Sequence, residues 1–203
     1  GTSVAFSPLY DKEGRKNIGL NYADREYFKK IKGSRKPVVG EIVRGKVLKE
    51  PLIPLASPLL DEKNQLIGAL IAGLDPKHVR NLIPYGEGSV TLTDEFGRVI
   101  AMTKTPEFEE QMKDLSSLAI FKEANKQPKG TAEYVSLRDG RKKLGAFYNL
   151  NNGWKIWVSR DMDEMQQAVM DSFYYAAFWG AIALLTAGFI GIFLSSAISK
   201  TIA

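Results

Sequence analysis

An apolar run near the carboxyl end constrains the fold of this chain more than any other feature. Residues 173–194, FYYAAFWGAIALLTAGFIGIFL, carry no charged side chain. A helix of this length rises about 1.5 Å per residue and can cross a hydrocarbon layer about 30 Å thick. A buried helix of a soluble domain is the alternative, but such helices rarely contain so long an apolar run. We therefore expect one transmembrane helix over residues 173–195.

The residues that flank this run predict its orientation. Tyr174, Tyr175 and Trp179 lie near its first end, where aromatic rings favour the membrane interface. Acidic residues precede the run, and the first charge after it is Lys200. The positive-inside rule then places Lys200 in the cytoplasm and residues 1–171 outside, on a cell (inner or plasma) membrane.

Composition excludes several kinds of site. The chain has 203 residues, a net charge of +5 and no cysteine, so it has no disulfide framework, thiolate metal site or cysteine nucleophile. Its densest basic stretch is KKIKGSRK, residues 29–36. This stretch could contact anionic lipid or nucleic acid, but a solvated helix end and loop is the favoured reading. We expect no nucleic-acid partner.

The first half of the chain predicts a helix followed by a hairpin. Asp24 can cap a short helix, REYFKKIK, which Gly33 would end. Two apolar runs of strand length within residues 52–75, joined by the polar turn DEKNQ, predict a buried hairpin. The segment PKHVRNLIP, residues 76–84, reads as a short helix or connector, and we place a domain boundary there.

The second half predicts a small sheet domain. SVTLTDEFGRVIAMT forms a hairpin pattern, and residues 106–127 are helical in composition with Pro106 in the first turn. Three strand-like runs follow, separated by Asp139-Gly140 and by Asn152-Gly153, which are strong hairpin signals. Two strands, helices and three antiparallel strands describe an α+β domain of the PAS-like kind.

The order of these segments resembles the bacterial double-Cache sensor domains. IGLNYADREYFKKI followed by LIPLASPLLDEKNQLIGALIAGLD is similar to their membrane-distal half, and TDEFGRVIAMT with GRKKLGAFYNLNNGWKIWVSRD to their membrane-proximal half. SSAISKTI is similar to the start of a HAMP linker. The resemblance implies an α+β fold of two PAS-like (Cache) antiparallel-sheet subdomains. The expected parts are an N-terminally incomplete distal subdomain (1–80), a proximal subdomain (81–160), an exit helix (161–172), a transmembrane helix (173–195) and the start of the HAMP-like linker (196–203).

The same resemblance implies a ligand pocket in the distal subdomain. Arg25 would meet a ligand carboxylate, Asp75 would meet a ligand ammonium, and Tyr27 and Phe28 would wall the pocket. Each residue also has a plainer reading. Arg25 can cap or pair at the helix start, Asp75 can be a turn residue, and the two aromatic rings can belong to the core. Amino-acid-binding members have Trp-Tyr at positions 27 and 28, so the implied ligand is a carboxylate, amine or other small polar metabolite.

No pattern in the chain points to catalysis. His78 is the only histidine, and no acidic or cysteine cluster surrounds it, so we expect no metal site, cofactor or catalytic residue. We expect the sensing region of a bacterial signal transducer, dimeric like its family, whose output would be a chemotaxis coil, a histidine kinase or a cyclic-dinucleotide enzyme. The alternative is a membrane-anchored domain that dimerises or binds another protein without a small ligand.

Overall fold

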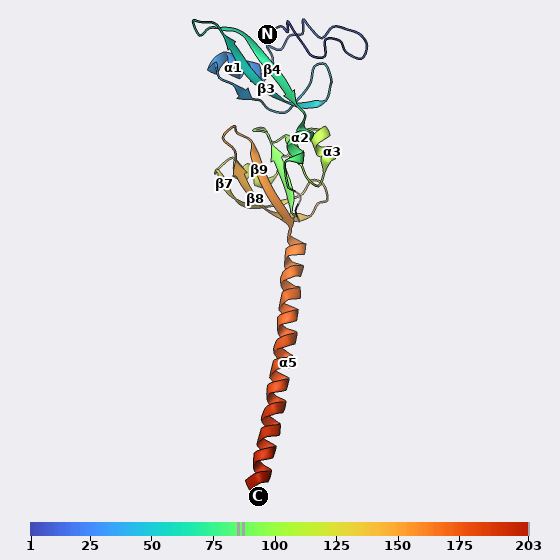
Figure 1. Ribbon diagram of the computed structural model, residues 1–203, viewed down its shortest axis with the longest axis vertical. Coiled ribbons are helices and arrows are strands. Elements are labelled where there is room, and N and C mark those ends of the chain that lie inside the picture. The colour runs from blue at the N-terminus through green and yellow to red at the C-terminus, as the bar shows by residue number, and fades with distance from the viewer. Residues whose placement is uncertain (85, 87, 203) are drawn as a thin grey trace. The chain divides into compact units, whose positions relative to one another are not determined.

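The computed structural model describes residues 1–84, 86 and 88–202, with side chains up to residue 191 except that of residue 168. The chain forms two compact units, Gly1–Arg160 and Asp161–Ala203. The first unit contains two antiparallel sheets with short helices, and the second is a single helix (Figure 1). An α+β chain with two antiparallel sheets and a terminal apolar helix is the fold class that the sequence predicts, and it is confirmed.

The first sheet is built around a long hairpin. Its strands are β1 (Val38–Val39), β2 (Val43–Arg44), β3 (Pro51–Leu60) and β4 (Leu66–Leu74). β3 pairs with β4 along nearly its whole length, and β1 and β2 both pair with the other side of β3. Asp61 closes the turn, because its Oδ1 accepts hydrogen bonds from the backbone of Lys63 and Gln65. The hairpin predicted for residues 52–75 is confirmed, but its predicted burial is wrong: only Ile53, Pro54 and Ala56 of its strands are buried, and β4 is partly or fully exposed along its length.

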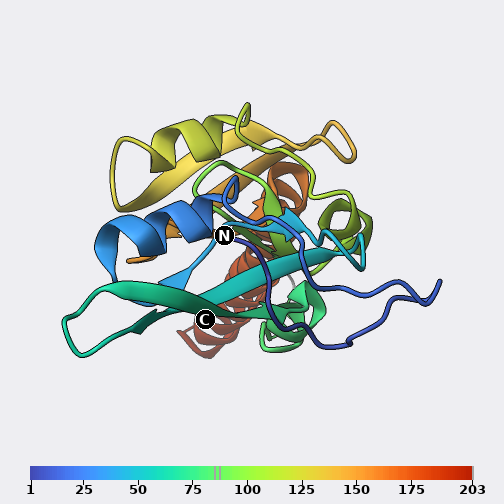
Figure 2. The same ribbon diagram turned by 90° about the horizontal axis from the view of Figure 1, so that it is seen from above.

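Helix α1 (Glu26–Ser34) packs beside this hairpin (Figure 2). It buries Tyr27 and Ile31 in a cluster with Val43 and Ala56. The predicted ends of the helix are wrong. Arg25 rather than Asp24 occupies the N-cap position, and the Asp24 carboxylate pairs with Lys46 at 2.8 Å. Gly33 lies inside the helix, and Arg35 ends it with a left-handed φ of 55°.

The second sheet has strand order β6-β5-β9-β8-β7. Its strands are β5 (Ser89–Thr93), β6 (Val99–Met102), β7 (Lys129–Val135), β8 (Lys142–Asn149) and β9 (Lys155–Asp161). Gly140 and Gly153 take φ of 69° and 89° in the two hairpin turns, where glycine meets no steric penalty. The hairpins predicted from Asp-Gly and Asn-Gly are therefore confirmed.

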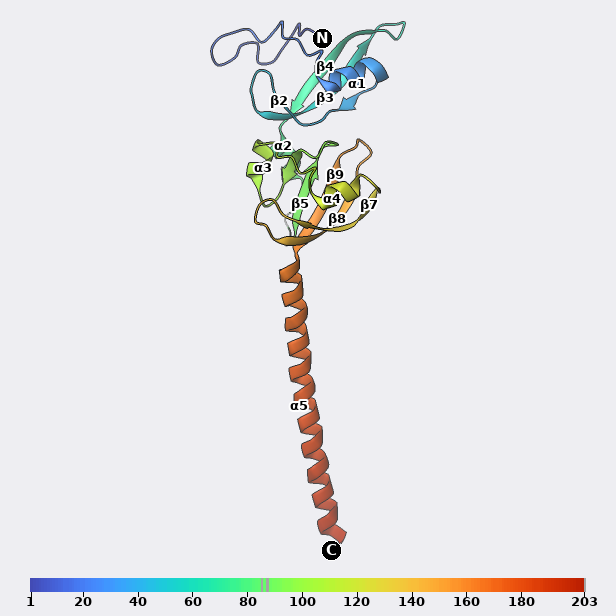
Figure 3. The ribbon, with the colours of Figure 1, turned by 180° about the vertical axis from the view of Figure 1, so that it is seen from behind.

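Three short helices accompany this sheet: α2 (Pro76–Asn81), α3 (Pro106–Glu110) and α4 (Ala119–Ala124). α4 lies against β7 and β8 (Figure 3) and buries Ile120 and Phe121 in a core with Phe147 and Trp157. Residues 106–127, predicted to be helical from their composition, form the two short helices α3 and α4. Met112 takes a left-handed φ of 49°, and the backbone after it bonds to the β5–β6 turn and to β6 instead.

The two sheets share a core. Ile42 and Ile53 from the first sheet region are fully buried with Leu92, Ile100 and Ala101 from the second. A cation of α1, Lys30, also pairs with Glu95 in the β5–β6 turn. Gly1–Arg160 is one compact unit in which the two sheets share one of the buried clusters.

The second unit is the helix α5 (Met162–Ile202). Its segment Met162–Gly191 is long and apolar enough to cross a membrane, judged by length and composition. Large apolar side chains such as Leu184 and Phe189 are about three-quarters exposed. The predicted HAMP-like start, residues 196–203, falls where side chains are not described, and Ala203 lies outside the described residues, so it stays a prediction.

Candidate functional site

Arg25 lies at the start of α1 and is only partly satisfied. Its backbone is extended, with φ −75° and ψ 132°, and its Nη2 donates to the carbonyl of Arg44 at 3.0 Å. Its Nε is buried, and no hydrogen-bond partner for it occurs among the described residues. A guanidinium that is anchored on one side and unpaired on another is suited to receive an anion.

Tyr27 and Phe28 follow after Glu26 in the first turn of α1. Tyr27 is 3% exposed, and Phe28 is half-buried against the same cluster. Burial raises the pKa of Tyr27 to about 12, although the nearby charge of Arg25 opposes the rise. Tyr27 therefore stays neutral and keeps its phenolic proton available for donation at neutral pH.

Gly40 lets the chain pass close to Tyr27. A Cβ at this position would lie 2.7 Å from Cγ of Pro54 and 2.9 Å from Cβ of Tyr27, closer than such atoms come in folded proteins. Only glycine fits without a shift of its neighbours. The close passage sets the position of the next residue, Glu41, relative to α1.

Glu41 is the functional candidate that the sequence reasoning missed. It is 5% exposed, its Oε2 is buried without a partner among the described residues, and its charge acts on Tyr27. The signal that could have found it is a single acid in the apolar stretch VVGEIV, residues 38–43. A buried carboxylate is costly unless it is paired, so this oxygen is suited to a cationic or donor group.

The rim of the site is polar. Lys46 Nζ lies 5.3 Å from the ring centroid of Tyr22 and pairs with Asp24 at 2.8 Å. Burial raises the pKa of Tyr22, opposed by the charge of Arg25, so both tyrosines lie in the field of the same guanidinium. The structure thus brings together Arg25, Tyr27 and Phe28 of the predicted residues.

Asp75 lies elsewhere in the first unit. It is exposed at the end of β4, and its Oδ1 accepts a hydrogen bond from Lys77 N at 2.9 Å, which caps α2. Among the described hydrogen bonds and ion pairs, none joins Asp75 to α1. Its predicted contact with a ligand ammonium stays a prediction, and Glu41 is the buried acid whose charge acts on Tyr27.

No metal site is visible in the part of the chain that is described. No group of three or more His, Cys, Asp or Glu side chains is placed there to hold an ion. His78 is exposed on α2. The charged and polar groups near α1 are one cation, Arg25, one buried acid, Glu41, and one phenol, Tyr27.

Comparison with known proteins agrees with this architecture. The sequence profile of the Cache domain matches residues 2–169. The chain belongs to the Cache domain family. The resemblance drawn from the sequence is therefore confirmed, and the match spans both sheets of the first unit.

Solved Cache structures share the fold at low identity. The extracellular domain of the candidate histidine kinase mmHK1S-Z3 matches with a TM-score of 0.61 and 16% identity, over 78% of this chain and 62% of that one. The ligand-binding domain of Mlp24 with asparagine matches with a TM-score of 0.57 and 20% identity, over 84% of this chain and 70% of that one. The ligand-binding domain of the Campylobacter jejuni chemoreceptor Tlp3 with L-norvaline matches with a TM-score of 0.52 and 17% identity, over 71% of this chain and 55% of that one. At these identities the likeness is one of fold.

One curated relative matches over a shorter region. Sporulation kinase D of Bacillus subtilis (strain 168) is 30% identical over 64 residues, which are 32% of this chain and 13% of the kinase. The Cache chain described here thus spans a small part of that protein and about three-fifths of the mmHK1S-Z3 domain.

Proposed function

We propose that this chain is the extracytoplasmic sensing region of a bacterial transmembrane signal transducer, and that its first sheet binds a small polar metabolite. The observation that carries the proposal is that two buried polar atoms of opposite charge, Arg25 Nε and Glu41 Oε2, have no hydrogen-bond partner among the described residues, while both side chains act electrostatically on Tyr27. Burying such atoms unpaired is unfavourable, and a ligand with both an acidic and a basic group would satisfy them together.

The ligand class follows from these groups. Arg25 would hold a carboxylate through its free Nε edge, and Glu41 would hold an ammonium or another donor. Tyr27 and Phe28 would cover the apolar part of the ligand. Two proteins of the same fold are known with amino acids, Mlp24 with asparagine and Tlp3 with L-norvaline, which supports an amino-acid-like zwitterion for this chain.

Membrane passage is the second part of the proposal. The exposed apolar segment of α5 would cross the bilayer, with residues 1–171 outside and Lys200 in the cytoplasm. β9 ends at Asp161 and α5 begins at Met162, so no loop separates sheet from helix. A ligand that favours one arrangement of the sheets would then bias the helix, and through it a kinase or chemotaxis output.

The test is thermal unfolding of the whole chain in detergent micelles, with amino acids, organic acids and amines as probes. A bound ligand at a hundred times its dissociation constant should add about 2.7 kcal/mol of stability, or a shift of roughly 5–10 °C. Arg25→Ala should abolish the shift. Arg15→Ala, which removes an exposed arginine in the amino-terminal segment, is the matched control and should retain it.

Glu41→Gln sharpens the result. This isosteric change should lower the affinity for ligands that carry an ammonium and leave the affinity for simple carboxylates unchanged. The unliganded variant should be at least as stable as the wild type. If no probe shifts the melt, or if Arg25→Ala shifts as the wild type does, the site at α1 is not the ligand site.

A second candidate function is dimerisation or protein binding without a small ligand. It is favoured by a group of exposed apolar side chains on β3 and β4, among them Leu59, Ile67 and Leu70, of which Ile67 is 71% exposed. Such patches often mark interfaces. A second copy of the chain is the proposed partner, and sedimentation of Ile67→Asp against the wild type tests it: equal masses would exclude a dimer through this face.

A further inference from the structure

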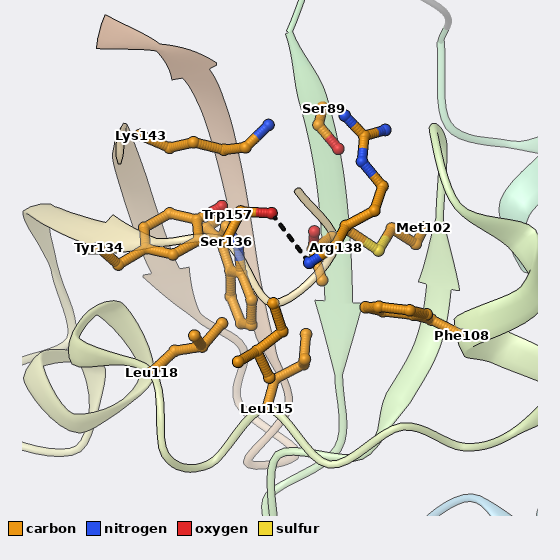
Figure 4. Close-up of a pocket in the computed structure, with 12 residues that line it drawn as sticks. Ser89, Met102, Phe108, Leu115, Leu118, Tyr134, Ser136, Arg138, Lys143 and Trp157 are labelled. Carbon is orange, nitrogen blue, oxygen red and sulfur yellow. Dashed lines mark hydrogen bonds between the residues drawn. The ribbon is translucent and has the colours of Figure 1, made fainter. Parts of the chain in front are cut away.

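Two hollows of the first unit differ greatly in size. The cavity inside the second sheet (Figure 4) offers about 20 Å³ to the centre of a water molecule, where one water needs about 10–15 Å³. It has room for about one water, which would pair with the buried hydroxyl of Thr91. The second hollow is an open depression of about 540 Å³ by the same measure. Sites for small molecules measure about 300–1,000 Å³, so of the two only this depression has room for one.

This depression lies between the end of α1 and the turn that joins β3 to β4. Lys32 and Arg35 line it from the helix end, and Lys63 lines it from the turn. Arg35 connects the two segments, because its Nη1 donates to the carbonyl of Asn64 at 2.9 Å. The other lining residues are Gln65 and Leu66. We call this hollow the basic depression, because three cations from two segments surround it.

The three lysines of α1 are of two kinds. Lys29 pairs with Glu26 at 2.6 Å, and Lys30 pairs with Glu95. Lys32 lines the basic depression, and its ammonium has no ion pair or hydrogen bond among the described residues. The basic stretch of residues 29–36 thus has acidic partners at its start, whereas the lysine in its last helical turn has none in the described part of the chain.

The acidic residues of the β3–β4 turn do not line the basic depression. Asp61 Oδ1 accepts hydrogen bonds from the backbone of Lys63 and Gln65 at 2.9 and 2.7 Å. Glu62 forms no ion pair with any described residue. The carboxyl end of a helix carries about half a negative charge, which is far less than the charge of two lysines and an arginine. The walls of the basic depression therefore carry three positive charges and no acidic side chain.

Arg35 occupies a backbone position where glycine is usual. The helix ends there with φ 55° and ψ 28°, the left-handed region that is sterically unfavourable for a residue with a side chain. Its Nη1 is held by Asn64, and no partner for its Nε or Nη2 occurs among the described residues. A guanidinium that is fixed in this way presents its Nε–Nη2 edge as a bidentate donor for an oxyanion.

We propose that the basic depression binds a phosphate monoester, a small organic molecule with one terminal phosphate. Such a phosphate carries about 1.5 to 2 negative charges at neutral pH and three acceptor oxygens. Arg35 would bind two of these oxygens through Nε and Nη2, and Lys32 and Lys63 would bind the third. The organic part would lie against Gln65 and Leu66. A single carboxylate would offset less of the positive charge.

This site is separate from the one at Arg25. Arg25 precedes the first turn of α1 and Arg35 follows the last, and ten residues of helix rise about 15 Å. A phosphate that bridges the helix end and the β3–β4 turn would hold α1 against the hairpin. The first sheet would thus receive a second input, at the end of α1 opposite to the site of the polar metabolite.

The experiment is a calorimetric titration of the whole chain in detergent micelles at low salt, with glycerol 3-phosphate as the probe. Glycerol and dimethyl phosphate, which has one negative charge, are the controls. Glycerol 3-phosphate should bind, dimethyl phosphate should bind about tenfold more weakly, and glycerol should not bind. Added NaCl should lower the affinity for glycerol 3-phosphate, because the cations of the site are exposed to solvent.

Arg35→Gly is the variant that separates binding from folding. Glycine favours the left-handed backbone at this position, so the variant should melt at about the same temperature as the wild type although it lacks the guanidinium. It should bind glycerol 3-phosphate about tenfold more weakly, and Lys63→Gln should act in the same direction. Lys29→Gln, which removes a paired cation of the same helix, is the matched control and should bind as the wild type does.

Three results would overturn the proposal. The first is that glycerol 3-phosphate does not bind, or that Arg35→Gly binds it as the wild type does. The second is an equal loss of affinity in Lys29→Gln and Lys63→Gln, which would mean that surface charge in general attracts the anion. The third is binding of phosphatidic acid in the micelles without binding of glycerol 3-phosphate, which would assign the basic depression to a lipid headgroup instead.

Discussion

At the scale of single residues, two groups of buried polar atoms have no hydrogen-bond partner among the described residues. They are Arg25 Nε and Glu41 Oε2 beside α1, and the hydroxyls and indole nitrogen of Ser89, Thr91 and Trp157 on the second sheet. Folded proteins pair the large majority of such atoms, so their grouping in two places calls for a physical reason. One such reason is a ligand that supplies the missing hydrogen-bond partners. Isosteric variants test the contribution of each atom to ligand binding separately.

Asp75 allows a prediction that separates a helix cap from a ligand contact. Because its Oδ1 caps α2, Asp75→Ala should destabilise the protein by about 1 kcal/mol, whereas Asp75→Asn, which also caps well, should cost almost nothing. Chemical denaturation of the two variants measures this difference. If Asp75→Asn keeps stability but loses the ligand-induced shift, the sequence-based ligand role of Asp75 is supported.

Glu109 provides a pH-dependent prediction. It is 4% exposed and binds Arg80 at 2.8 Å and Met102 N at 2.7 Å. Burial raises its pKa above the usual 4.5, opposed by the hydrogen bond from Met102 and the charge of Arg80. Since the folded state holds this proton more tightly, stability falls as pH rises from 4.5 through the folded pKa.

Arg80→Ala should make the loss of folding stability with rising pH larger. The variant leaves the ionised carboxylate buried and unpaired, so it should lose about 3 kcal/mol near pH 7 and clearly less near pH 4, where Glu109 is protonated. Urea unfolding at both pH values is the measurement. Lys126→Ala, which breaks an exposed pair with Glu123, should cost no more than about 0.5 kcal/mol at either pH. A pH-independent loss in Arg80→Ala would contradict the assignment.

At the scale of elements, local sequence signals located hairpins better than helix ends. Asp139-Gly140 and Asn152-Gly153 fix turns through the glycine conformation itself. The ends of α1 and the break after α3 depend instead on distant partners. Asp24 is drawn to Lys46, and the backbone around Lys113 and Leu115 bonds to Val99 and Gly97.

Two turn glycines give a paired prediction at this scale. Gly97 has φ 92°, and a Cβ there would lie 2.8 Å from Ser116 N, whereas Gly140 has φ 69° with open space around it. Gly140→Ala should lower the free energy of unfolding by about 1 kcal/mol, because alanine is unfavourable in the left-handed backbone conformation. Gly97→Ala should cost a further 1–3 kcal/mol, roughly, because the contacting atom belongs to the backbone. Equal losses in denaturant unfolding would show that the Gly97 turn can move away from Ser116.

At the scale of the whole molecule, the shared interior of the two sheets predicts cooperative unfolding. Ile42 and Ile53 are fully buried with Leu92 and Ile100, so unfolding of either sheet exposes part of the core of the other. Calorimetry should show a single unfolding transition for Gly1–Arg160. Ile42→Ala should shift this whole transition to lower temperature, because it should reduce the free energy of unfolding by about 2–5 kcal/mol. Two transitions, of which the variant moves only one, would mean that the sheets unfold independently.

The sequence by itself determined the features that depend on local patterns: the apolar helix at the end, the hairpins, the order of elements and the Cache family. It also singled out Arg25, Tyr27 and Phe28. Only the tertiary structure decided that Glu41 is buried where its charge acts on Tyr27, that Asp75 caps α2, and that hydroxyls of β5 are buried without a partner among the described residues. The reason is physical: whether a polar atom is satisfied depends on groups far away in the chain, which a local pattern does not contain.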